Sequence, residues 1–335
     1  MLVPFSEIDP DFVHPTKNKN ISELLLKQDS SNINIFISKG NNLMHSNLKI
    51  NNMNLVWGSR TYVMGIINMT PDSFSGDGLN SSDSPIEFAL HQAKSFIDSG
   101  ADILDIGGES TRPGSDSVGS QEELDRVIPV IEKISSEFDT VISIDTYKHE
   151  VAEAAVKAGA NMINDVWGFN ADPKMAQTVA KLGVPVILMH NRSNPKTAEI
   201  QENLGGRYIG VEYQNLIIDI KNELMESVKL ARDAGIPDEM IILDPGIGFG
   251  KTVEQNLELL NKTDQIRELG FPVLVGPSRK SFIGYALDLP QDQRVEGTAA
   301  TVAVAIVRGA DIVRVHDVGM MVRISRMTDA IVRNE

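Results

Sequence analysis

The sequence predicts an α/β fold, a closed (β/α)8 TIM barrel with an irregular N-terminal extension. Between residues 61 and 332, apolar runs rich in β-branched residues alternate with helical patterns eight times. Polar residues follow nearly every apolar run, as expected of a barrel that carries its active site on the loops after its strands. The alternative is an open doubly wound sheet, but no GxGxxG pattern follows the first run.

The apolar runs are the strand candidates, each taken with the residue at its carboxyl end. In chain order they are TYVMGII ending at Asn68, ADILDI ending at Ile106, VISI ending at Asp145, NMI ending at Asn164, PVILM ending at Met189, MIIL ending at Asp244, PVLV ending near Gly276 and ADIVRV ending near His316. The size and the number of these units fit the closed barrel.

Helical patterns separate the runs. In QEELDRVIPVIEKISSEF the apolar residues Leu124, Val127, Ile128, Ile131 and Ile134 recur at helical spacing. Pro129 lies inside this segment, and because a proline in a helix interior favours a bend, we expect the helix to bend there. HEVAEAAVKAG ends on a glycine that suits a helix C-terminal cap.

The first part of the chain differs in composition and in the spacing of its apolar residues. Residues 17 to 54 contain ten asparagines and few regularly spaced apolar residues, which predicts irregular structure, although short runs such as NIFI could fold onto the main body. We therefore expect residues 1 to 60 to be an extension of unknown function. Residues 61 to 335 are expected to form the catalytic barrel.

Composition excludes several classes of protein. With 31 basic and 46 acidic residues the formal net charge is -15, which argues against a nucleic-acid binder or a membrane-surface protein. The chain has no cysteine, so disulfides, thiolate metal sites and cysteine nucleophiles are excluded. No signal-peptide pattern opens the sequence, and its longest strongly apolar run, AATVAVAIV, is too short to span a bilayer. A cytoplasmic protein is expected.

The strand ends collect polar residues at one mouth of the predicted barrel. They are Asn68, Thr111, Arg112, Asp145, Asn164, Asp244, Lys280, Arg314 and His316. Carboxylates, amides and a lysine can pair with the N-H groups and ring acceptors of a flat heterocycle. Arginine binds phosphate or carboxylate through bidentate geometry. The pattern predicts an anionic heterocyclic substrate.

Each residue also has a purely structural interpretation. Asp145 and Asp165 could be helix N-caps, at about even odds for either residue alone. DPGIGFGK (244 to 251) could be a glycine-rich turn with a solvated lysine, His316 a core histidine and SRK (278 to 280) a surface charge cluster. The six histidines show no zinc-site spacing. A structural account would have to hold independently at almost every strand end, so we favour a site.

Seven motifs in this order resemble the dihydropteroate synthase family. They are NMTPDSFSGDG (68 to 78), GGESTRPG (107 to 114), SIDT (143 to 146), IND (163 to 165), LDPGIGFGK (243 to 251), SRKS (278 to 281) and RVHD (314 to 317). TPDSF and GESTRPG are highly specific, and the resemblance covers residues 61 to 332. It implies a transferase of folate biosynthesis that condenses 6-hydroxymethyl-7,8-dihydropterin diphosphate with 4-aminobenzoate and releases diphosphate.

The resemblance also implies roles for single residues. The pterin pocket would comprise Asp145, Asn164, Met189, Asp244, Phe249 and Lys280. Diphosphate would meet Asn68, Arg314 and His316, and aminobenzoate would meet Phe74, Thr111, Arg112, Pro113 and Ser281. Asp145, Lys280, Arg112 and Asn68 are the expected catalytic residues.

The same resemblance implies Mg²⁺ as cofactor, a dissociative mechanism and inhibition by sulfonamides. Asn68 would be the metal ligand, because substrate oxygens can supply most of the coordination sphere of magnesium. One departure lies in the first loop, where SFSGDG replaces the family's commonest SFSDGG, so Asp77 would have to act from a shifted position.

Two rival functions and the oligomeric state stay open. A corrinoid-dependent methyltransferase barrel would share the pterin contacts but gives no reason for TPDSF, GESTRPG or SRKS, and a non-catalytic pterin binder would not need a complete site. The resemblance implies a homodimer. The small residues of GTAATVAVAIVRG would allow close helix packing, either between subunits or against the barrel wall.

Overall fold

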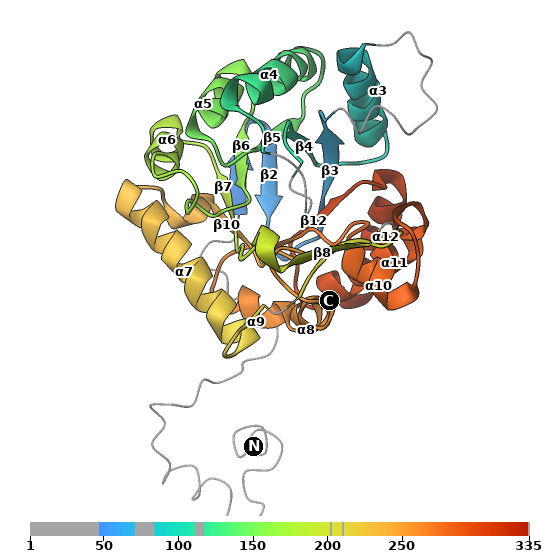
Figure 1. The fold of residues 1–335 in the computed structure, drawn as a ribbon. Coiled ribbons are helices and arrows are strands. Elements are labelled where there is room, and N and C mark those ends of the chain that lie inside the picture. Colours follow the sequence, from blue (N-terminus) through green and yellow to red (C-terminus); the bar gives the residue numbers. More distant parts are fainter. Residues whose placement is uncertain (1–46, 71–83, 111–116, 202, 210, 334–335) are drawn as a thin grey trace, which may run out of the picture. The chain divides into compact units, whose positions relative to one another are not determined.

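Eight parallel strands form the centre of the unit Asn42–Glu335 in this computed structural model (Figure 1). The structure describes residues 47–70, 84–110, 117–201, 203–209 and 211–333, which all belong to the unit Asn42–Glu335. The strands are β3 (Tyr62–Asn68), β4 (Ile103–Gly107), β5 (Val141–Asp145), β6 (Met162–Asp165), β7 (Val186–Met189), β10 (Ile241–Asp244), β11 (Leu274–Val275) and β12 (Ile312–Val315).

The order of the strands closes the sheet into a barrel. Neighbours run β10-β7-β6-β5-β4-β3-β12-β11, and a parallel bridge between Leu243 and Val273 joins the two ends. All eight predicted strands are present, and each ends within one residue of its predicted end. The predicted (β/α)8 barrel is confirmed, and the open sheet is excluded.

Helices cover the outside of the barrel (Figure 1). They are α3 (Pro85–Asp98), α4 (Ser120–Glu137), α5 (His149–Ala158), α6 (Met175–Leu182), α7 (Leu216–Ala234), α8 (Val253–Asn261), α9 (Thr263–Arg267), α10 (Ser281–Leu287), α11 (Val295–Val307) and α12 (Val318–Val332). Local sequence sets several ends: Ser84 and Glu87 form a capping box on α3, and Gly159 caps α5 in the left-handed region, as predicted.

Two apolar clusters stabilise this arrangement. The larger lies between the sheet and the helices. The smaller closes the amino-terminal end of the barrel, where β1 (Asn47–Ile50) and β2 (Met53–Val56) form an antiparallel hairpin. Leu48, Ile50 and Leu55 are buried in this cluster with Trp57, beside strand residues such as Tyr62. The hairpin thus forms the floor opposite the strand ends that carry the predicted site.

The hairpin corrects one expectation. Residues 47 to 54 lie in the asparagine-rich stretch that predicted irregular structure, yet they form strands because their apolar residues alternate with polar ones. The hairpin precedes the predicted boundary at residue 60 but belongs to the same unit as the barrel.

A second hairpin, β8 (Ala198–Gln201) and β9 (Gly205–Tyr208), lies in the connection from β7 to α7. Tyr285 on α10 donates a hydrogen bond to the carbonyl of Gly205, and Arg294 donates one to the carbonyl of Leu204. The hairpin is therefore bound to α10 and to the N-cap residue of α11. Within the described segments, no helix has both the length and the apolar character needed to cross a bilayer.

Candidate active site

Arg314 links three strands at the carboxyl end of the barrel. From β12, its Nε donates to Asp105 Oδ2 on β4 and its Nη2 donates to Asp145 Oδ2 on β5, each at 2.6 Å. Asn164 on β6 donates to the same Asp105 oxygen at 3.2 Å. The predicted residues Asp145, Asn164 and Arg314 are therefore brought together, with Asp105 at their centre.

Charge and burial act against each other in this group. Burial raises the pKa of Asp145, Arg314 lowers it, and the negative charge of Asp105 raises it again. Burial disfavours the charged form of Arg314, but the two carboxylates outweigh this and raise its pKa. One guanidinium is therefore shared by two carboxylates, and the net result is a pKa of Asp145 raised to about 7.

Asp105 is the main site residue that the sequence analysis missed. It is fully buried, and its Oδ1 has no hydrogen-bond partner among the described residues; the same holds for Oδ1 of Asn164. An unpaired buried acceptor costs about 1–3 kcal/mol, so N-H groups of a bound molecule would stabilise both. The available signal was an acid within the apolar run ADILDI, one residue before its predicted end at Ile106.

Asp244, Phe249 and Lys280 form the other part of the site. Asp244 ends β10, is buried, and accepts a hydrogen bond from Gly246 N at 2.7 Å. Lys280 donates to the carbonyl of Ile247, and its Nζ lies 4.4 Å from the centre of the Phe249 ring. Burial lowers the pKa of Lys280 to about 8, although Asp244 opposes this shift.

The backbone around Lys280 is held from several sides. Arg279 adopts a left-handed conformation (φ 55°), which costs free energy in a residue with a side chain. Its N-H donates to Thr298 Oγ1 at 3.0 Å, and its guanidinium pairs with Asp317 at 2.5 Å. Ser278 is buried, and Arg279 and Lys280 are only partly exposed and make the contacts given above, so SRK is not a freely solvated charge cluster.

The remaining described residues of the predicted site lie at strand or helix ends. Asn68 ends β3 beside Gly107, and Met189 is buried at the end of β7. His316 follows β12, and its Nδ1 lies 3.0 Å from Ser278 Oγ. Ser281 is the first residue of α10. Phe74, Thr111, Arg112 and Pro113, and the displaced Asp77, lie outside the described residues.

The structural interpretations of single residues have different outcomes. Asp145 is not a helix cap, because the N-cap of α5 is Lys148. Asp165 does shape backbone, but in a turn: it accepts from Trp167 N at 2.8 Å and from Phe169 N at 2.9 Å. The lysine that closes DPGIGFGK is not solvated, since Lys251 is only 1% exposed.

Comparison with known proteins agrees with the residues at the mouth. The model of the family described as pterin binding enzyme matches residues 64–316. A dihydropteroate synthase of Clostridium beijerinckii is 53% identical over 287 residues, which cover 85% of this chain and all of that protein. The chain belongs to the dihydropteroate synthase family. The prediction of a transferase of the folate pathway is confirmed with it.

Solved dihydropteroate synthase structures share the fold. The enzyme of Clostridium difficile in the presence of pteroic acid has a TM-score of 0.74 and 47% identity, over 83% of this chain and 99% of that one. The Xanthomonas albilineans synthase with 4-aminobenzoic acid has a TM-score of 0.76 and 40% identity, and a Yersinia pestis synthase with a sulfonamide drug has 0.76 and 39%. Each of these two matches covers 85% of this chain and 98% of the solved chain.

Proposed function

We propose that this member of the family condenses 6-hydroxymethyl-7,8-dihydropterin diphosphate with 4-aminobenzoate to form 7,8-dihydropteroate and diphosphate. The main support is the buried group around Arg314, in which Asp105 and Asn164 each keep an acceptor oxygen without a partner among the described residues. A pterin carries N-H groups along its edge that match such acceptors. Pteroic acid and 4-aminobenzoic acid occur with the related enzymes.

Asp105, Asp145, Asn164, Asp244 and Lys280 would bind the pterin ring. Phe249 lies against Lys280 and Met189 is buried at a neighbouring strand end, so these two would supply the apolar walls. The acids come from three strands of a rigid sheet, which limits their motion and favours one orientation of the ring.

The second substrate and the leaving group would lie nearer the loops. Arg314, His316 and Asn68 would face diphosphate. Ser281 would receive the aminobenzoate carboxylate, together with Phe74, Thr111, Arg112 and Pro113, which remain predictions because they are not described. Arg112 would raise the affinity for aminobenzoate more than that for the pterin.

A dissociative reaction suits these residues. The bond between the pterin methylene carbon and the diphosphate oxygen breaks first, and its electron pair leaves with diphosphate. The arylamine nitrogen then attacks the cationic methylene carbon and loses a proton to solvent. Buried carboxylates near the ring would stabilise the cation electrostatically, so no strong general base is needed.

Magnesium fits the donor set at the mouth of the barrel. Among the described residues, no group of three acidic or histidine side chains is arranged to hold a metal ion, so an ion would depend on substrate oxygens, as Mg²⁺ commonly does. The Asn68 amide oxygen would hold it. The ion would supply positive charge to the departing diphosphate.

Three further properties belong to the same proposal. Sulfonamides would inhibit the enzyme, as the complex of the Yersinia pestis synthase suggests. The chain would act as a cytoplasmic homodimer, with exposed apolar residues on α11 and α12, such as Val307, Met327 and Ile331, available for contact between subunits. Light scattering of the purified protein would measure its mass in solution, and a monomer would contradict the dimer.

The deciding experiment measures dihydropteroate by mass together with diphosphate release, from pterin diphosphate and Mg²⁺ with and without 4-aminobenzoate. We expect both products only when aminobenzoate is present. Asp145→Asn should abolish the reaction while far-UV circular dichroism shows an unchanged fold. Pterin binding without product would instead favour a pterin binder or the corrinoid-dependent methyltransferase, which a methyl-transfer assay would identify.

A further inference from the structure

Lys251 is buried behind the glycine-rich loop that follows β10. Its Nζ contacts three acceptors: the carbonyl of Gly246 at 2.8 Å, the carbonyl of Phe249 at 3.0 Å and His190 Nδ1 at 3.0 Å. An ammonium group has three donors and no acceptor, so the charged form of Lys251 satisfies all three contacts. No carboxylate touches this ammonium within the described residues.

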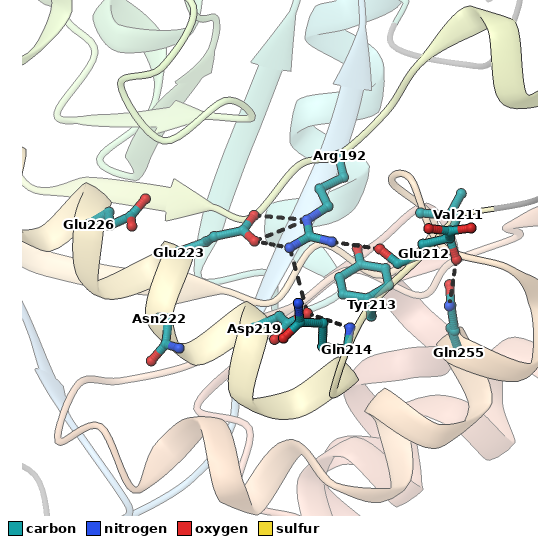
Figure 2. Close-up of a pocket in the computed structure, with 10 residues that line it drawn as sticks. All are labelled: Arg192, Val211, Glu212, Tyr213, Gln214, Asp219, Asn222, Glu223, Glu226 and Gln255. Carbon is teal, nitrogen blue, oxygen red and sulfur yellow. Dashed lines mark hydrogen bonds and ion pairs between the residues drawn. The ribbon is translucent and has the colours of Figure 1, made fainter.

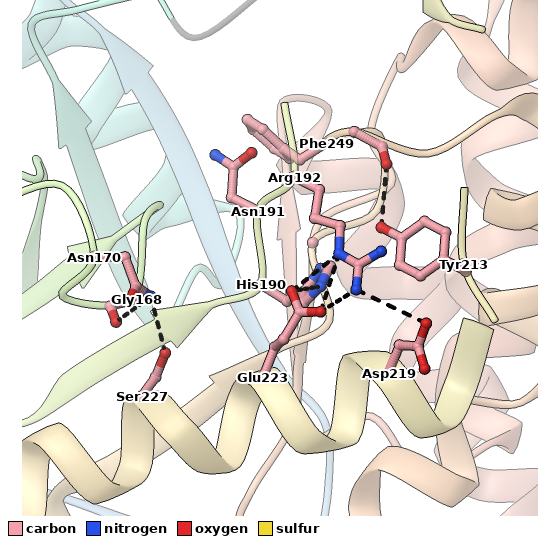
Figure 3. Close-up of polar contacts among 12 residues, drawn as sticks. Gly168, Asn170, His190, Asn191, Arg192, Tyr213, Asp219, Glu223, Ser227 and Phe249 are labelled. Atoms are coloured by element: carbon pink, nitrogen blue, oxygen red, sulfur yellow. Dashed lines mark hydrogen bonds and ion pairs between the residues drawn. The ribbon is translucent and has the colours of Figure 1, made fainter. Parts of the chain in front are cut away.

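The counter-charge lies on the far side of His190. Because Nδ1 accepts from Lys251, the neutral imidazole carries its proton on Nε2, which lies 3.0 Å from Glu223 Oε2. Glu223 on α7 also accepts from Arg192 Nε at 3.0 and 3.1 Å. Figure 3 shows Glu223 rising from α7 between His190 and Arg192. Lys251, His190 and Glu223 thus form one continuous chain, which we call the buried relay.

The loop held by Lys251 fits closely against the segment after β7. Gly246 (φ 71°) is so close to this segment that a Cβ atom there would lie 1.9 Å from the His190 carbonyl oxygen. A Cβ on Gly250 would lie 2.2 Å from the Arg192 carbonyl carbon. Tyr213 OH adds a hydrogen bond to the Gly250 carbonyl at 3.1 Å. The loop conformation therefore depends on residues 190 to 192.

The same loop carries pieces of the proposed pterin pocket. Gly246 N fixes one oxygen of Asp244, the Ile247 carbonyl accepts from Lys280, and the Phe249 ring lies against Lys280. Lys251 itself occupies none of these contacts. A change at Lys251 would reach the pterin by moving the loop and by removing a charge that lowers the pKa of Asp244.

We propose that the buried relay of Lys251, His190 and Glu223 positions the pterin-facing loop 244–251, so that a partly exposed side chain on α7 controls pterin affinity. These are positioning residues, and the inference rests on the proposed function. The outer end is accessible: Glu223, Arg192 and Tyr213 line a cavity of about 720 Å³, together with Asp219 (Figure 2). None of the predicted site residues lines this cavity.

Two substitutions test the relay from its two ends. Lys251→Met removes the donor to the Phe249 carbonyl and to His190 Nδ1, while the Gly246 carbonyl keeps the hydrogen bond from Phe249 N. Glu223→Gln keeps an acceptor for His190 but removes the negative charge. We expect each to raise the Kd for pterin diphosphate, measured by calorimetry, with about a tenfold rise for Lys251→Met. The KM for 4-aminobenzoate should stay unchanged, because the relay holds only the pterin-facing loop.

Glu226→Gln is the matched control. Glu226 lies on the same helix, lines the same cavity and is exposed, and the change removes the same charge. It should leave the Kd for pterin diphosphate and the KM for 4-aminobenzoate unchanged. A general loss of stability would lower the Tm and would affect the Kd for pterin diphosphate and the KM for 4-aminobenzoate alike. A rise in the Kd for pterin diphosphate alone therefore identifies a positioning role.

The outcomes separate the relay from the function on which it rests. If the unsubstituted protein does not bind pterin diphosphate, the proposed function is wrong. If it binds and Glu223→Gln binds equally well, the relay is wrong even though the function stands. Should Lys251→Met fail to fold, Glu223→Gln decides alone, since its side chain is 34% exposed and the change leaves the core as it is.

Discussion

Arg314 and Lys251 are buried cations with opposite surroundings. Arg314 contacts two carboxylates directly, which raise its pKa, whereas Lys251 contacts carbonyls and a neutral imidazole. Burial lowers the pKa of Lys251 to about 7, because Asp244 and Glu223 offset only part of the desolvation. The identity of the neighbours, rather than burial itself, decides whether a buried cation keeps its charge.

Asp105→Asn should weaken pterin binding without unfolding the protein. The substitution keeps the shape of the side chain but removes a charge that accepts from both Arg314 and Asn164. Hydrogen bonds to charged groups contribute about 1.5–3 kcal/mol, so the Kd for pterin diphosphate should rise roughly 10- to 100-fold.

Calorimetric titration measures this loss. Asp233→Asn is a suitable control, because Asp233 lies on the exposed face of α7, where it pairs with Lys229. Equal affinity in the Asp105 and Asp233 variants would remove Asp105 from the pterin site.

His190 should titrate far below an ordinary histidine. Burial and the nearby Lys251 charge lower its pKa from 6.5 to about 4, although Glu223 opposes the shift. Between these two values the unfolded chain binds more protons than the folded chain, so this residue reduces the free energy of unfolding as the pH falls from 6.5 toward 4. The full effect is about 3 kcal/mol.

Nitrogen-15 NMR of the imidazole rings would report the titration, and His190→Gln would identify the resonance. The unsubstituted protein should also lose more stability than His190→Gln over this pH range in urea unfolding. A midpoint near the ordinary histidine value of 6.5 would show that His190 is not held between Lys251 and Glu223.

At the scale of elements, the contact between the β7 and β10 loops is the tightest constraint near the site. The β10 loop has three glycines with positive φ: Gly246, Gly248 and Gly250. Gly246 and Gly250 lie against backbone, which cannot move as a side chain can, whereas Gly248 lies against the flexible end of Lys280. Two loops from neighbouring strands therefore behave as one unit.

Gly246→Ala should be strongly destabilising. The new Cβ would meet the His190 carbonyl oxygen in addition to the strain of a left-handed alanine, so we expect a loss of more than about 3 kcal/mol in the free energy of unfolding. Gly183→Ala isolates the strain alone: Gly183 has a similar φ of 66°, and no atom lies within 4 Å of the place that the new methyl group would take. It should cost about 1–2 kcal/mol.

Urea unfolding compares the two glycine variants directly. Equal losses in the free energy of unfolding would mean that the β7 and β10 loops separate easily. The inference that the two loops behave as one unit would then be wrong. A larger loss for Gly246→Ala would locate the rigidity of the pterin-facing loop in its contact with residue 190.

For the whole molecule, charge opposes the approach of the first substrate. The chain has a formal net charge of -15, and the described site places the carboxylates of Asp105, Asp145 and Asp244 near Lys280, Arg314 and Lys251. A diphosphate ester is repelled by such a protein until it reaches the local cations. Magnesium bound to the substrate would reduce this repulsion.

Added salt should therefore speed the association of pterin diphosphate. The Debye length falls from about 30 Å at 0.01 M to about 10 Å at 0.1 M, which screens the distant negative charges before the contacts inside the site. Stopped-flow fluorescence would measure the rate, with an uncharged pterin alcohol as control, whose rate should not change. A rate that falls with salt would show that local cations dominate the approach.

Patterns along the chain are sufficient to predict the barrel, the positions of its eight strands and the end at which polar residues gather. These follow from local periodicity, because burial on both faces makes each strand apolar and parallel strands place their carboxyl ends on one side. The same patterns predicted Asp145, Asn164, Asp244, Lys280 and Arg314 as site residues, because their polar side chains lie within or just after the apolar runs.

Which side chains meet is set by the packing of distant segments. Arg314 contacts Asp105 across 209 positions of sequence, and Lys251 reaches His190 across 61, so no local pattern contains either pair. The same separation explains why Asp105 was missed and why a solvated Lys251 was one of the alternatives. The local sequence pattern specifies each helix or strand and the side of the barrel at which it ends. Strand register and close backbone packing determine the partner of each buried polar group, and that partner determines its charge.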